Sequence, residues 1–515
     1  MQQTIFDMLY PKYKITKPIR LIEFFAGYGS QALALKYLGV EFEHWKICEW
    51  AIKSIQAYKD IHMNNKEFKD TYMTKEQMVD FLYSKGISAN YNEPMSKQQI
   101  ERLKEEQLEN IIKNIFITHN LVNIQQVKGK DLEIVDTDKY DYILTYSFPC
   151  QDLSLAGKGK GMSDTSTRSG MLWEVERILK ECKEIDELPQ ILLMENVPQV
   201  HGENNVEDFN KWQLELEKLG YKNYFQDLIA TDYGIPQTRN RCFMISILGN
   251  YSYTFPKPIQ LKLKLKDMLE DEVDEKYYLS DKMLDYCLGI NQKESKFPRG
   301  ERFLQSLEQT NEKDIATTIT TNAGNRPTDN FIKIKNATKK GYLEATDGDG
   351  IDISSRMEHH RGTVQKDKAQ TLTTQCDRGV VVNMKTELCN NLIKDGKVKE
   401  NDVIRHSYTT SRMNGEMKDL KQNNLSPTLD TRCDCLGVVN NMRIRKLTPR
   451  EAFRLMGVKD EDFNKVKKNQ SDSSLYHLAG DSLVTMVFCA IMSTMIDNCK
   501  TLEQVLEEFY LQISN

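Results

Sequence analysis

The chain opens with alternating strand-like and helix-like hydrophobic patterns. Residues 19–25 form an apolar run of strand length, and a glycine turn at 26–30 breaks it. Residues 31–38 then space leucines as an amphipathic helix does, and 42–49 form a second strand that ends in an acid. Strand, glycine turn, helix and a strand with a terminal carboxylate form the start of a doubly wound α/β fold.

This α/β rhythm continues to about residue 250 through three more apolar runs, at 142–146, 191–194 and 242–246. From 251 to 442 the sequence is rich in Thr, Asn and Gly, with short β-branched runs that end in glycine, a pattern typical of strands and loops. We therefore expect a Rossmann-like α/β domain over 1–250, a second, mainly β and loop domain over 251–442, and a return to the first domain over 443–515.

A helical insertion is expected between the second and third strands, at about 64–123. Thr74 with Gln77 and Ser96 with Gln99 have the spacing of capping boxes, in which side chain and backbone cap each other at a helix start. Behind the second box, apolar residues from Ile100 to Ile115 follow one helical stripe. We expect this insertion to pack on the body, and the sequence gives it no function of its own.

The second domain contains an internal repeat. The pattern Ala/Ser-x-Thr-Leu/Ile-x-Thr recurs at 316–321, 369–374 and 426–431. The copies are either packing units of one enlarged domain or separate recognition elements. Packing is favoured, because Thr-Leu-Thr strands bury well and a duplicated motif need not keep its function.

Composition narrows the classes of protein. The chain has 515 residues and a net charge of −5; residues 292–450 hold 28 Lys and Arg and 21 Asp and Glu, so they carry 28 − 21 = +7 and the remainder −5 − 7 = −12. Such an asymmetry fits an acidic enzyme body with a nucleic-acid-facing segment, and equally a solvated face.

No apolar run of roughly 18 residues predicts a membrane span, and no secretory signal is apparent at the N-terminus. Eleven cysteines without a Cys-x-x-Cys pair favour neither a disulfide framework nor a metal site, so we expect no metal and a reducing cytoplasm.

The glycine turn and the acid at the end of the second strand suggest the class of ligand. Gly27-x-Gly29 lacks the third glycine of a dinucleotide fingerprint, and no phosphate-binding lysine accompanies it. Glu49 lies where a carboxylate would hold ribose hydroxyls. An adenosine ligand without a pyrophosphate fits these features better than NAD or ATP.

Reactive side chains follow three of the predicted strands. Cys150, preceded by Pro149, lies beyond the strand at 142–146, where an open α/β sheet has its active-site crevice. Glu195 follows the next strand, and partial enclosure would raise its pKa enough for proton donation. Arg239 and Arg241, two residues apart at the start of a further strand, share one face and could bind a carbonyl or phosphate.

Taken in order, these motifs resemble the DNA (cytosine-5)-methyltransferases of bacteria and phages. The resemblance rests on the following segments, which span most of the chain: Phe25-Ala-Gly-Tyr-Gly29, Glu49-Trp50, Gly129-Lys-Asp-Leu132, Pro149-Cys150, Glu195-Asn-Val197, Gln237-x-Arg239-x-Arg241, Arg445-Lys-Leu-Thr-Pro-Arg-Glu451 and Gly480-Asp-Ser482. Three features depart from the family pattern: Glu23 replaces an aspartate, Asp481 replaces an asparagine, and the insertion is longer.

The resemblance implies an S-adenosyl-L-methionine-dependent enzyme that methylates carbon 5 of a cytosine flipped out of double-stranded DNA. It implies Cys150 as the nucleophile, with Glu195, Arg239 and Arg241 as the other catalytic residues. The implied cofactor-binding residues are Phe25, Ala26, Gly27, Gly29, Ser30, Glu49, Trp50, Asp131, Leu132, Pro149, Asp481 and Ser482. The implied DNA-facing and target-loop residues are Ser154, Lys158, Gln237, Thr428, Leu429 and Arg432.

The resemblance also implies a monomer in the cytoplasm of a bacterial or phage-infected cell, without membrane association; any restriction endonuclease partner would be a separate chain. Three alternatives remain. An RNA cytosine-5 methyltransferase shares the fold but has a short recognition region, unlike 251–442. A catalytically silent DNA-binding relative is disfavoured by the intact Cys150, Glu195 and Arg241. A redox enzyme that uses the same glycine turn ranks third.

Overall fold

The computed structural model describes residues 10–63, 66, 68, 72–148, 169–237, 239–263, 265–268, 270, 273–277 and 448–513, together with seven strand segments between 350 and 446. Its main feature is a mixed sheet of six strands in the order β2-β1-β3-β4-β6-β5. The strands are β1 (Ile19–Phe24), β2 (Phe42–Cys48), β3 (Asp141–Tyr146), β4 (Ile191–Asn196), β5 (Tyr221–Ile229) and β6 (Asn240–Leu248).

Strands β1 to β4 run parallel, and β6 is antiparallel to both of its neighbours. The carboxyl ends of β1 to β4 therefore lie at the same edge of the sheet. The α/β fold and the expected strands are confirmed. Because β1, β3 and β4 are buried along their whole length, they consist of nearly continuous apolar residues, as parallel strands covered on both faces do.

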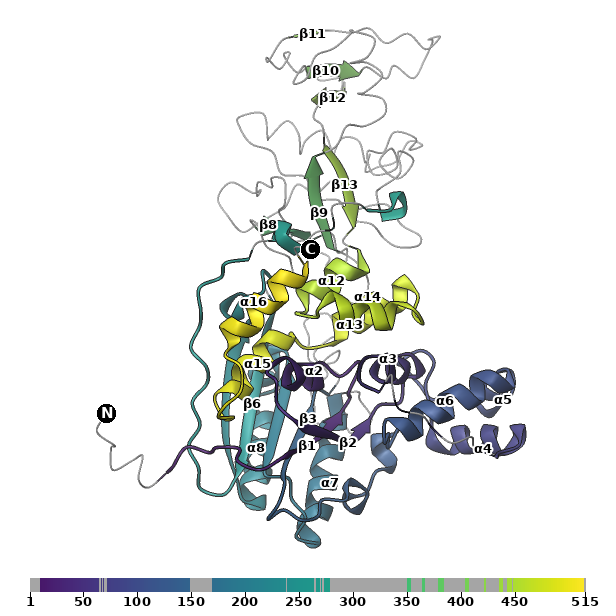
Figure 1. Cartoon of the computed structure of the whole chain (residues 1–515), viewed down its shortest axis with the longest axis vertical. Helices are drawn as coiled ribbons and strands as arrows, with labels where there is room; N and C mark the ends of the chain where they lie inside the picture. The colour runs from purple at the N-terminus through teal and green to yellow at the C-terminus, as the bar shows by residue number, and fades with distance from the viewer. Residues whose placement is uncertain are drawn as a thin grey trace. The chain divides into compact units, whose positions relative to one another are not determined.

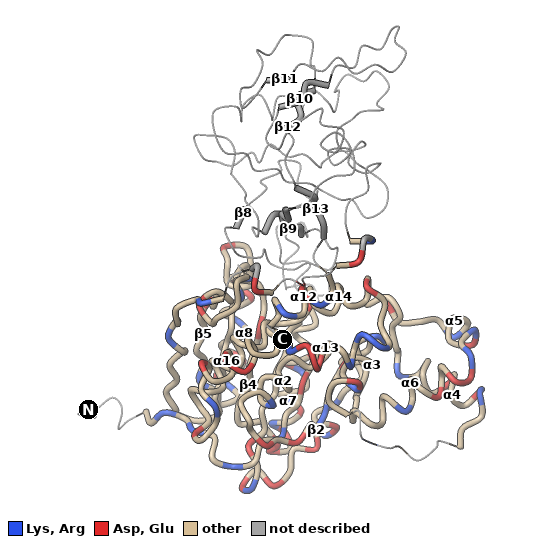
Figure 2. Tube along the Cα trace, turned by 45° about the horizontal axis from the view of Figure 1, so that its top comes forward, with Lys and Arg blue, Asp and Glu red and all other residues tan. Residues whose placement is uncertain are grey.

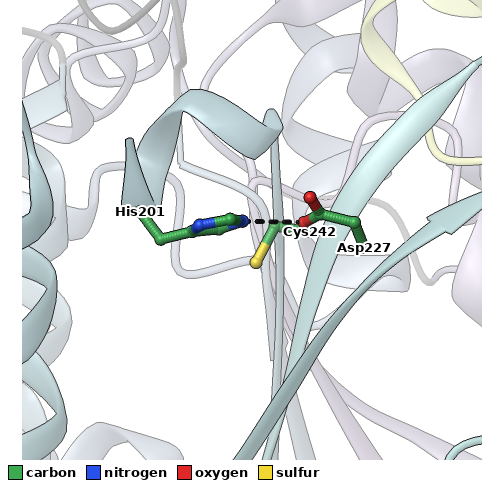
Figure 3. A group of neighbouring side chains, drawn as sticks. All are labelled: His201, Asp227 and Cys242. Carbon is green, nitrogen blue, oxygen red and sulfur yellow. Dashed lines mark hydrogen bonds and ion pairs between the residues drawn. The ribbon is translucent and has the colours of Figure 1, made fainter. Parts of the chain in front are cut away.

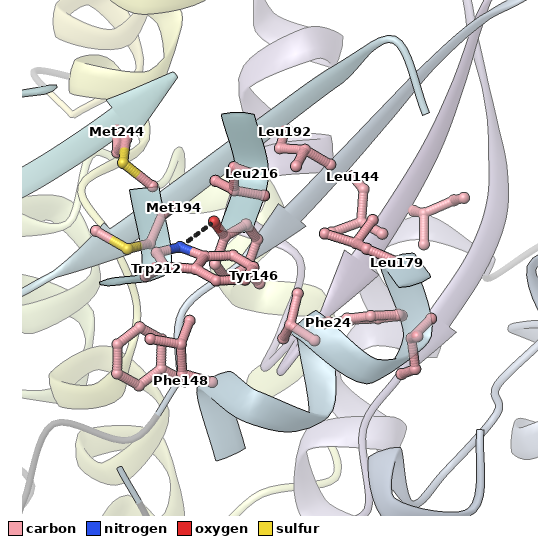
Figure 4. Close-up of a cluster of buried hydrophobic side chains, with 14 of the residues drawn as sticks. Phe24, Leu144, Tyr146, Phe148, Leu179, Leu192, Met194, Trp212, Leu216 and Met244 are labelled. Atoms are coloured by element: carbon pink, nitrogen blue, oxygen red, sulfur yellow. Dashed lines mark hydrogen bonds between the residues drawn. The ribbon is translucent and has the colours of Figure 1, made fainter. Parts of the chain in front are cut away.

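One face of the sheet is covered by α7 (Leu172–Glu184) and α8 (Val206–Leu219). Phe24, Leu144 and Met194 point from the strands into a buried cluster with side chains of both helices (Figure 4). Trp212 of α8 donates its indole N–H to the Tyr146 hydroxyl at 3.2 Å, which satisfies both polar groups inside this core.

The other face carries α2 (Ser30–Tyr37) and α3 (Ile52–His62), with helices from the C-terminal part of the chain (Figure 1). Helix α15 (Thr485–Ser493) packs against α2, and α13 (Asp460–Lys467) against α3. The remaining helices of this part are α12 (Pro449–Leu455), α14 (Asp472–Asp481) and α16 (Leu502–Ile513). The stretch Asp472–Ser493 is apolar and long enough to cross a membrane, but 78% of its 18-residue apolar window is buried inside the structure, as expected for helices of a core.

The insertion is helical, as predicted. It contains α4 (Lys75–Lys85), α5 (Lys97–Glu101) and α6 (Glu105–Ile117), and both expected capping boxes are formed. A separate hydrophobic cluster joins the three helices and includes Ile55 of α3, so the insertion is anchored to the main body through α3.

The chain divides into two compact units, residues 1–263 with 452–515 and residues 264–451. Both divisions fall later in the chain than the boundaries expected at 250 and 442. Ser252 donates its backbone N–H to Pro11, which keeps this segment with the first unit, and β13 (Met442–Lys446) pairs with a strand of the second. In the first unit, acidic and basic residues are interspersed along the chain (Figure 2).

The described part of the second unit includes short strands that form two sheets. One sheet has the order β13-β9-β7-β8 and another β11-β10-β12. Besides β13, the strands of these two sheets are β7 (Gly350–Asp352), β8 (Val364–Gln365), β9 (Arg378–Asn383), β10 (Val403–His406), β11 (Lys421–Gln422) and β12 (Cys435–Val438). The three Thr-rich repeats lie outside the described residues.

Candidate active site

The glycine turn after β1 has a backbone shape that only particular residues tolerate. Gly27 and Gly29 have φ of +56° and +78°, and Phe25 shares this left-handed region at +57°. A Cβ atom at Gly29 would lie 2.6 Å from the Tyr58 ring and 2.5 Å from the imidazole of His62. Gly29 is therefore required by the close packing of α3 against the turn, and it does not line the cavity described below.

Glu49, at the end of β2, is fixed by backbone donors on both of its carboxylate oxygens. The N–H of Gly27 donates to Oε2 at 3.0 Å and that of Ala51 to Oε1 at 2.8 Å. Burial raises the pKa of Glu49 to about 7, although the two N–H groups act in the opposite direction; Asp481 raises it further. The carboxylate therefore holds the glycine turn and still faces the cavity.

These residues line one cavity of about 430 Å³ at the carboxyl edge of the sheet, within the size range of small-molecule sites. Most of the residues predicted from sequence and described in the structure contribute to its wall. They form two groups: Phe25, Ala26, Gly27, Ser30, Glu49, Trp50, Asp481 and Ser482, whose part of the wall we call the cofactor end after their predicted role, and Glu195, Arg239 and Arg241, whose part we call the base end. Ser147, Phe148 and Asn196 also line the cavity.

Two predicted cofactor residues do not reach this cavity. Asp131 accepts a hydrogen bond from the Lys128 backbone N–H and so caps its own short helical turn, Gly129–Leu132. Leu132 is fully buried in the hydrophobic core, and its carbonyl accepts from the indole of Trp45. Both residues therefore have partners within the protein and do not line the cavity.

Residues 122–125 do line the cavity, although the sequence did not indicate them. Asn120 determines their position: its Nδ2 donates to the carbonyl of Glu49 at 2.8 Å, and its Oδ1 accepts from the N–H groups of Glu49 and Val122. This single buried amide joins the end of β2 to the returning chain. No local sequence signal marks it, because its partner is 71 residues away.

At the base end, Glu195 of β4 and Arg241 of β6 form an ion pair, with 3.1 Å between Oε1 and Nε. Both side chains are largely buried, so the pair acts in a poorly hydrated site where charge interactions are stronger than in water. The neighbouring Asn196 donates Nδ2 to the carbonyl of Phe148 at 3.0 Å, which fixes the chain immediately before Pro149 and Cys150.

Arg239 and Gln237 have internal partners. Arg239 is buried and donates to the carbonyl of Gly480 at 3.1 Å, so it secures the end of α14 beside the cavity. Gln237 is fully buried and donates to the carbonyl of Leu455 at 2.6 Å. Its burial does not agree with the predicted DNA-facing role.

Next to the base end, the side chains of His201, Asp227 and Cys242 meet (Figure 3). Their ligand atoms lie within 4.8 Å of one another, a spacing that could hold a metal ion. His201 Nε2 lies 2.9 Å from Asp227 Oδ1, and burial raises the pKa of Cys242 above its ordinary value, so the thiol is protonated. The group therefore behaves as a His–Asp pair that ties the turn after β4 to β5.

Seven predicted site residues lie outside the described part of the chain. They are Pro149, Cys150, Ser154, Lys158, Thr428, Leu429 and Arg432. Cys150 follows Phe148, a residue of the cavity wall, by two positions in the sequence.

Residues 81–497 match the family model of C-5 cytosine-specific DNA methylases. The type II methyltransferase M2.ScrFI of Lactococcus lactis subsp. cremoris is 37% identical over 286 residues, which cover 53% of this chain and 76% of that protein. The orphan methyltransferase M.SssI of Spiroplasma monobiae is 40% identical over 281 residues, 53% of this chain and 70% of that protein. The type II methyltransferase M.BanI of Aneurinibacillus aneurinilyticus is 27% identical, but the match extends over 73% of this chain and 85% of that protein.

Proposed function

This chain belongs to the C-5 cytosine-specific DNA methylases and is a DNA (cytosine-5)-methyltransferase, and from that premise we propose how its cavity performs the reaction. The proposal is that the cofactor end binds S-adenosyl-L-methionine and the base end binds a cytosine flipped out of duplex DNA. The observation that supports it is that one cavity is lined both by the Glu49 clamp and by the Glu195–Arg241 pair.

The residues of the cofactor end fit an adenosine-based methyl donor. Glu49 presents a carboxylate to accept hydrogen bonds from ribose hydroxyls, and Phe25 and Trp50 add aromatic surface to the same wall. When bound, the donor supplies an electrophilic methyl group on a sulfonium. The clamp from Gly27 and Ala51 keeps the Glu49 carboxylate in place before the donor arrives, which reduces the entropy lost on binding.

The remaining chemistry is assigned to residues of this chain. The Cys150 thiolate adds to carbon 6 of cytosine while Glu195 delivers a proton to ring nitrogen 3, and Arg241 holds both Glu195 and the exocyclic oxygen. The resulting enamine is nucleophilic at carbon 5, which cytosine itself is not. After methyl transfer, the carbon 5 proton passes to water, the Cys150 thiolate is expelled and the proton on ring nitrogen 3 returns to Glu195, which restores the aromatic ring and the enzyme.

The test is covalent trapping on DNA that contains 5-fluorocytosine at the target position. Fluorine at carbon 5 cannot leave as a proton, so the wild-type protein should remain attached to the DNA after methyl transfer. Cys150→Ala should form no covalent complex and no product, yet should still bind specific DNA. A covalent complex with Cys150→Ala would remove this residue from the mechanism. Methylation of tRNA rather than duplex DNA would favour the RNA-directed alternative.

We further propose that the second unit, through Thr428, Leu429 and Arg432, contributes to target recognition. The sequence supports this, because the segment 426–440 that contains these residues precedes the family motif at 445–451. Genome-wide methylation mapping of Thr428 and Arg432 variants should show altered site choice. Equivalent changes at Thr371 and Arg378 should mainly lower the melting temperature; loss of one class of methylated sites at an unchanged melting temperature would identify the copies as separate recognition elements.

A further inference from the structure

The helical insertion reaches the cofactor end of the cavity through the loop between α4 and α5. Tyr91, Asn92 and Pro94 of this loop line the cavity. The loop is attached directly beyond Glu49: Ser88 donates its N–H to the carbonyl of Trp50 at 2.8 Å, and Ile52 donates to the carbonyl of Ser88 at 2.9 Å. The insertion is therefore connected to the site by the residues that immediately follow Glu49.

The loop has a defined internal structure that sets the direction of Tyr91. Asn90 Oδ1 accepts from the backbone N–H groups of Asn92 and Glu93, and the Ser88 hydroxyl donates to the carbonyl of Glu93 at 2.7 Å. Between these bonds Tyr91 has φ of +64°. A left-handed tyrosine is strained by about 1 kcal/mol or more, and such strain persists only where the surroundings enforce it.

Tyr91 packs against α14, another element of the cavity wall. Its ring lies against that of His477, with centroids 3.8 Å apart and planes inclined by 45°. Burial raises the pKa of Tyr91 to about 12, so the hydroxyl is neutral beside Ser54 and Ser474. His477 Nε2 lies 3.0 Å from Asp481 Oδ2, and both residues line the cavity.

We propose that Tyr91 and His477 form a latch over the cofactor end and that Tyr91 is a methyl-donor-binding residue supplied by the insertion. The inference rests on the proposed function, since it concerns the same cavity. Tyr91 belongs to the loop wall, with Asn92 and Pro94, and His477 to the α14 wall, with Asp481. The ring contact joins the loop to α14, and on this proposal the donor leaves between these two elements, so the rings must separate for its release. The latch therefore slows release of the donor.

The variants are Tyr91→Ala, His477→Ala and the double substitution, with Tyr83→Ala as the matched control. Tyr83 lies on α4 of the same insertion, but its side chain is 52% exposed. The dissociation constant of S-adenosyl-L-methionine is measured by calorimetry, and its release rate by chasing radiolabelled donor with unlabelled donor, both without DNA.

Each single variant should release the donor roughly three- to tenfold faster, as expected for the loss of one aromatic contact. The double variant should be no faster than the faster single variant, because one contact is lost in each case. Tyr83→Ala should match the wild type.

If Tyr91→Ala folds and releases the donor at the wild-type rate, the latch is wrong. If that variant fails to fold, His477→Ala decides by the same criterion, because it removes the partner ring from the other wall. Additive effects in the double variant would also contradict a shared contact. A wild-type protein that binds no donor would overturn the proposed cofactor, and the latch with it.

Discussion

The two ends of the cavity each use a buried glutamate at the end of a strand, but they hold it in different ways. Glu49 is held by the backbone N–H groups of Gly27 and Ala51. Glu195 is held by the side chain of Arg241. A backbone clamp persists when neighbouring side chains change, whereas an ion pair depends on two individual residues.

On the proposed function, this difference separates donor binding at Glu49 from proton transfer at Glu195. The Glu49 clamp combines two neutral donors with a carboxyl whose pKa burial raises to about 7, an arrangement suited to accepting hydrogen bonds from hydroxyl groups. The Glu195–Arg241 pair places a carboxyl group that can exchange a proton beside the fixed positive charge of a guanidinium. This arrangement is suited to a cytosine ring whose charge changes during the reaction. Substitutions at the two glutamates should therefore affect different kinetic constants.

The largest effect is expected for Glu195→Gln. Glutamine can form hydrogen bonds but cannot deliver a proton, and general acid catalysis is typically worth about 10²–10⁴-fold. Single-turnover methylation with saturating donor and DNA should slow by this factor, while the calorimetric dissociation constant of the donor stays at the wild-type value. A near-normal single-turnover rate would remove Glu195 from the mechanism.

Glu49→Gln should give the opposite pattern. The amide keeps the size of the side chain, but its NH2 group must face the backbone N–H of either Gly27 or Ala51, which is a donor too. The variant also loses the charge-assisted hydrogen bonds to the ribose hydroxyls. Donor affinity should fall roughly ten- to hundredfold, and the rate at saturating donor should stay within a few-fold of wild type. If Glu49→Gln lowers the saturated rate and leaves donor affinity unchanged, the division of roles between the two ends is wrong.

The sequence predicted most of the fold because its signals are local. Apolar runs mark β1, β3 and β4, and the boxes at Thr74 and Ser96 each require only residues three positions apart. Glu49 and Glu195 were predicted to share one crevice because parallel strands end at one edge of a sheet, and both line the cavity.

What the sequence missed depends on contacts between distant segments. Asn120 binds the backbone of Glu49, and Tyr91 of the insertion contacts His477 of α14. Each contact joins two segments that are far apart in the sequence, so the pattern of polar and apolar residues within either segment does not predict it. Asp131 does not line the cavity: an acid in a turn that contains a glycine can cap the turn as readily as it can bind a ligand, and here it caps.

A matched pair of substitutions sharpens the boundary of the cofactor end. Asn123 and Asp131 each accept a backbone N–H in a short helical turn, from Gln125 and Lys128 respectively, but only Asn123 lines the cavity. Asn123→Ala and Asp131→Ala should lower the melting temperature by similar small amounts. Only Asn123→Ala should also weaken donor binding, by roughly two- to tenfold. Weakened binding in Asp131→Ala alone would restore the sequence-based assignment.

The smallest effect concerns a buried acid beneath the cofactor end. Glu23 of β1 accepts hydrogen bonds from the Tyr58 hydroxyl at 2.5 Å and the Ala32 N–H at 3.3 Å, and the Tyr58 hydroxyl in turn lies 2.9 Å from His44 Nδ1. Burial raises the pKa of Glu23 to about 7 from an ordinary value of 4.5. The resulting stability is fully present below pH 4.5 and is lost as the pH rises through 7.

Glu23→Gln mimics the protonated carboxyl, since its amide can donate to the Tyr58 hydroxyl while that hydroxyl donates to His44. The variant should therefore melt roughly 2 °C above wild type at pH 8 and no higher than wild type at pH 5. Comparing the two proteins at each pH cancels the contributions of His44 and His62, whose pKa values burial lowers to about 2 and about 4. Glu41→Gln, at an exposed position before β2, is the control and should change neither melting point. A variant less stable than wild type at pH 8 would mean that the hydrogen bonds of an ionised Glu23 outweigh the desolvation of its charge. Both ends of the cavity would then depend on an ionised glutamate. The only remaining difference between them would be that backbone N–H groups hold Glu49, whereas an arginine side chain holds Glu195.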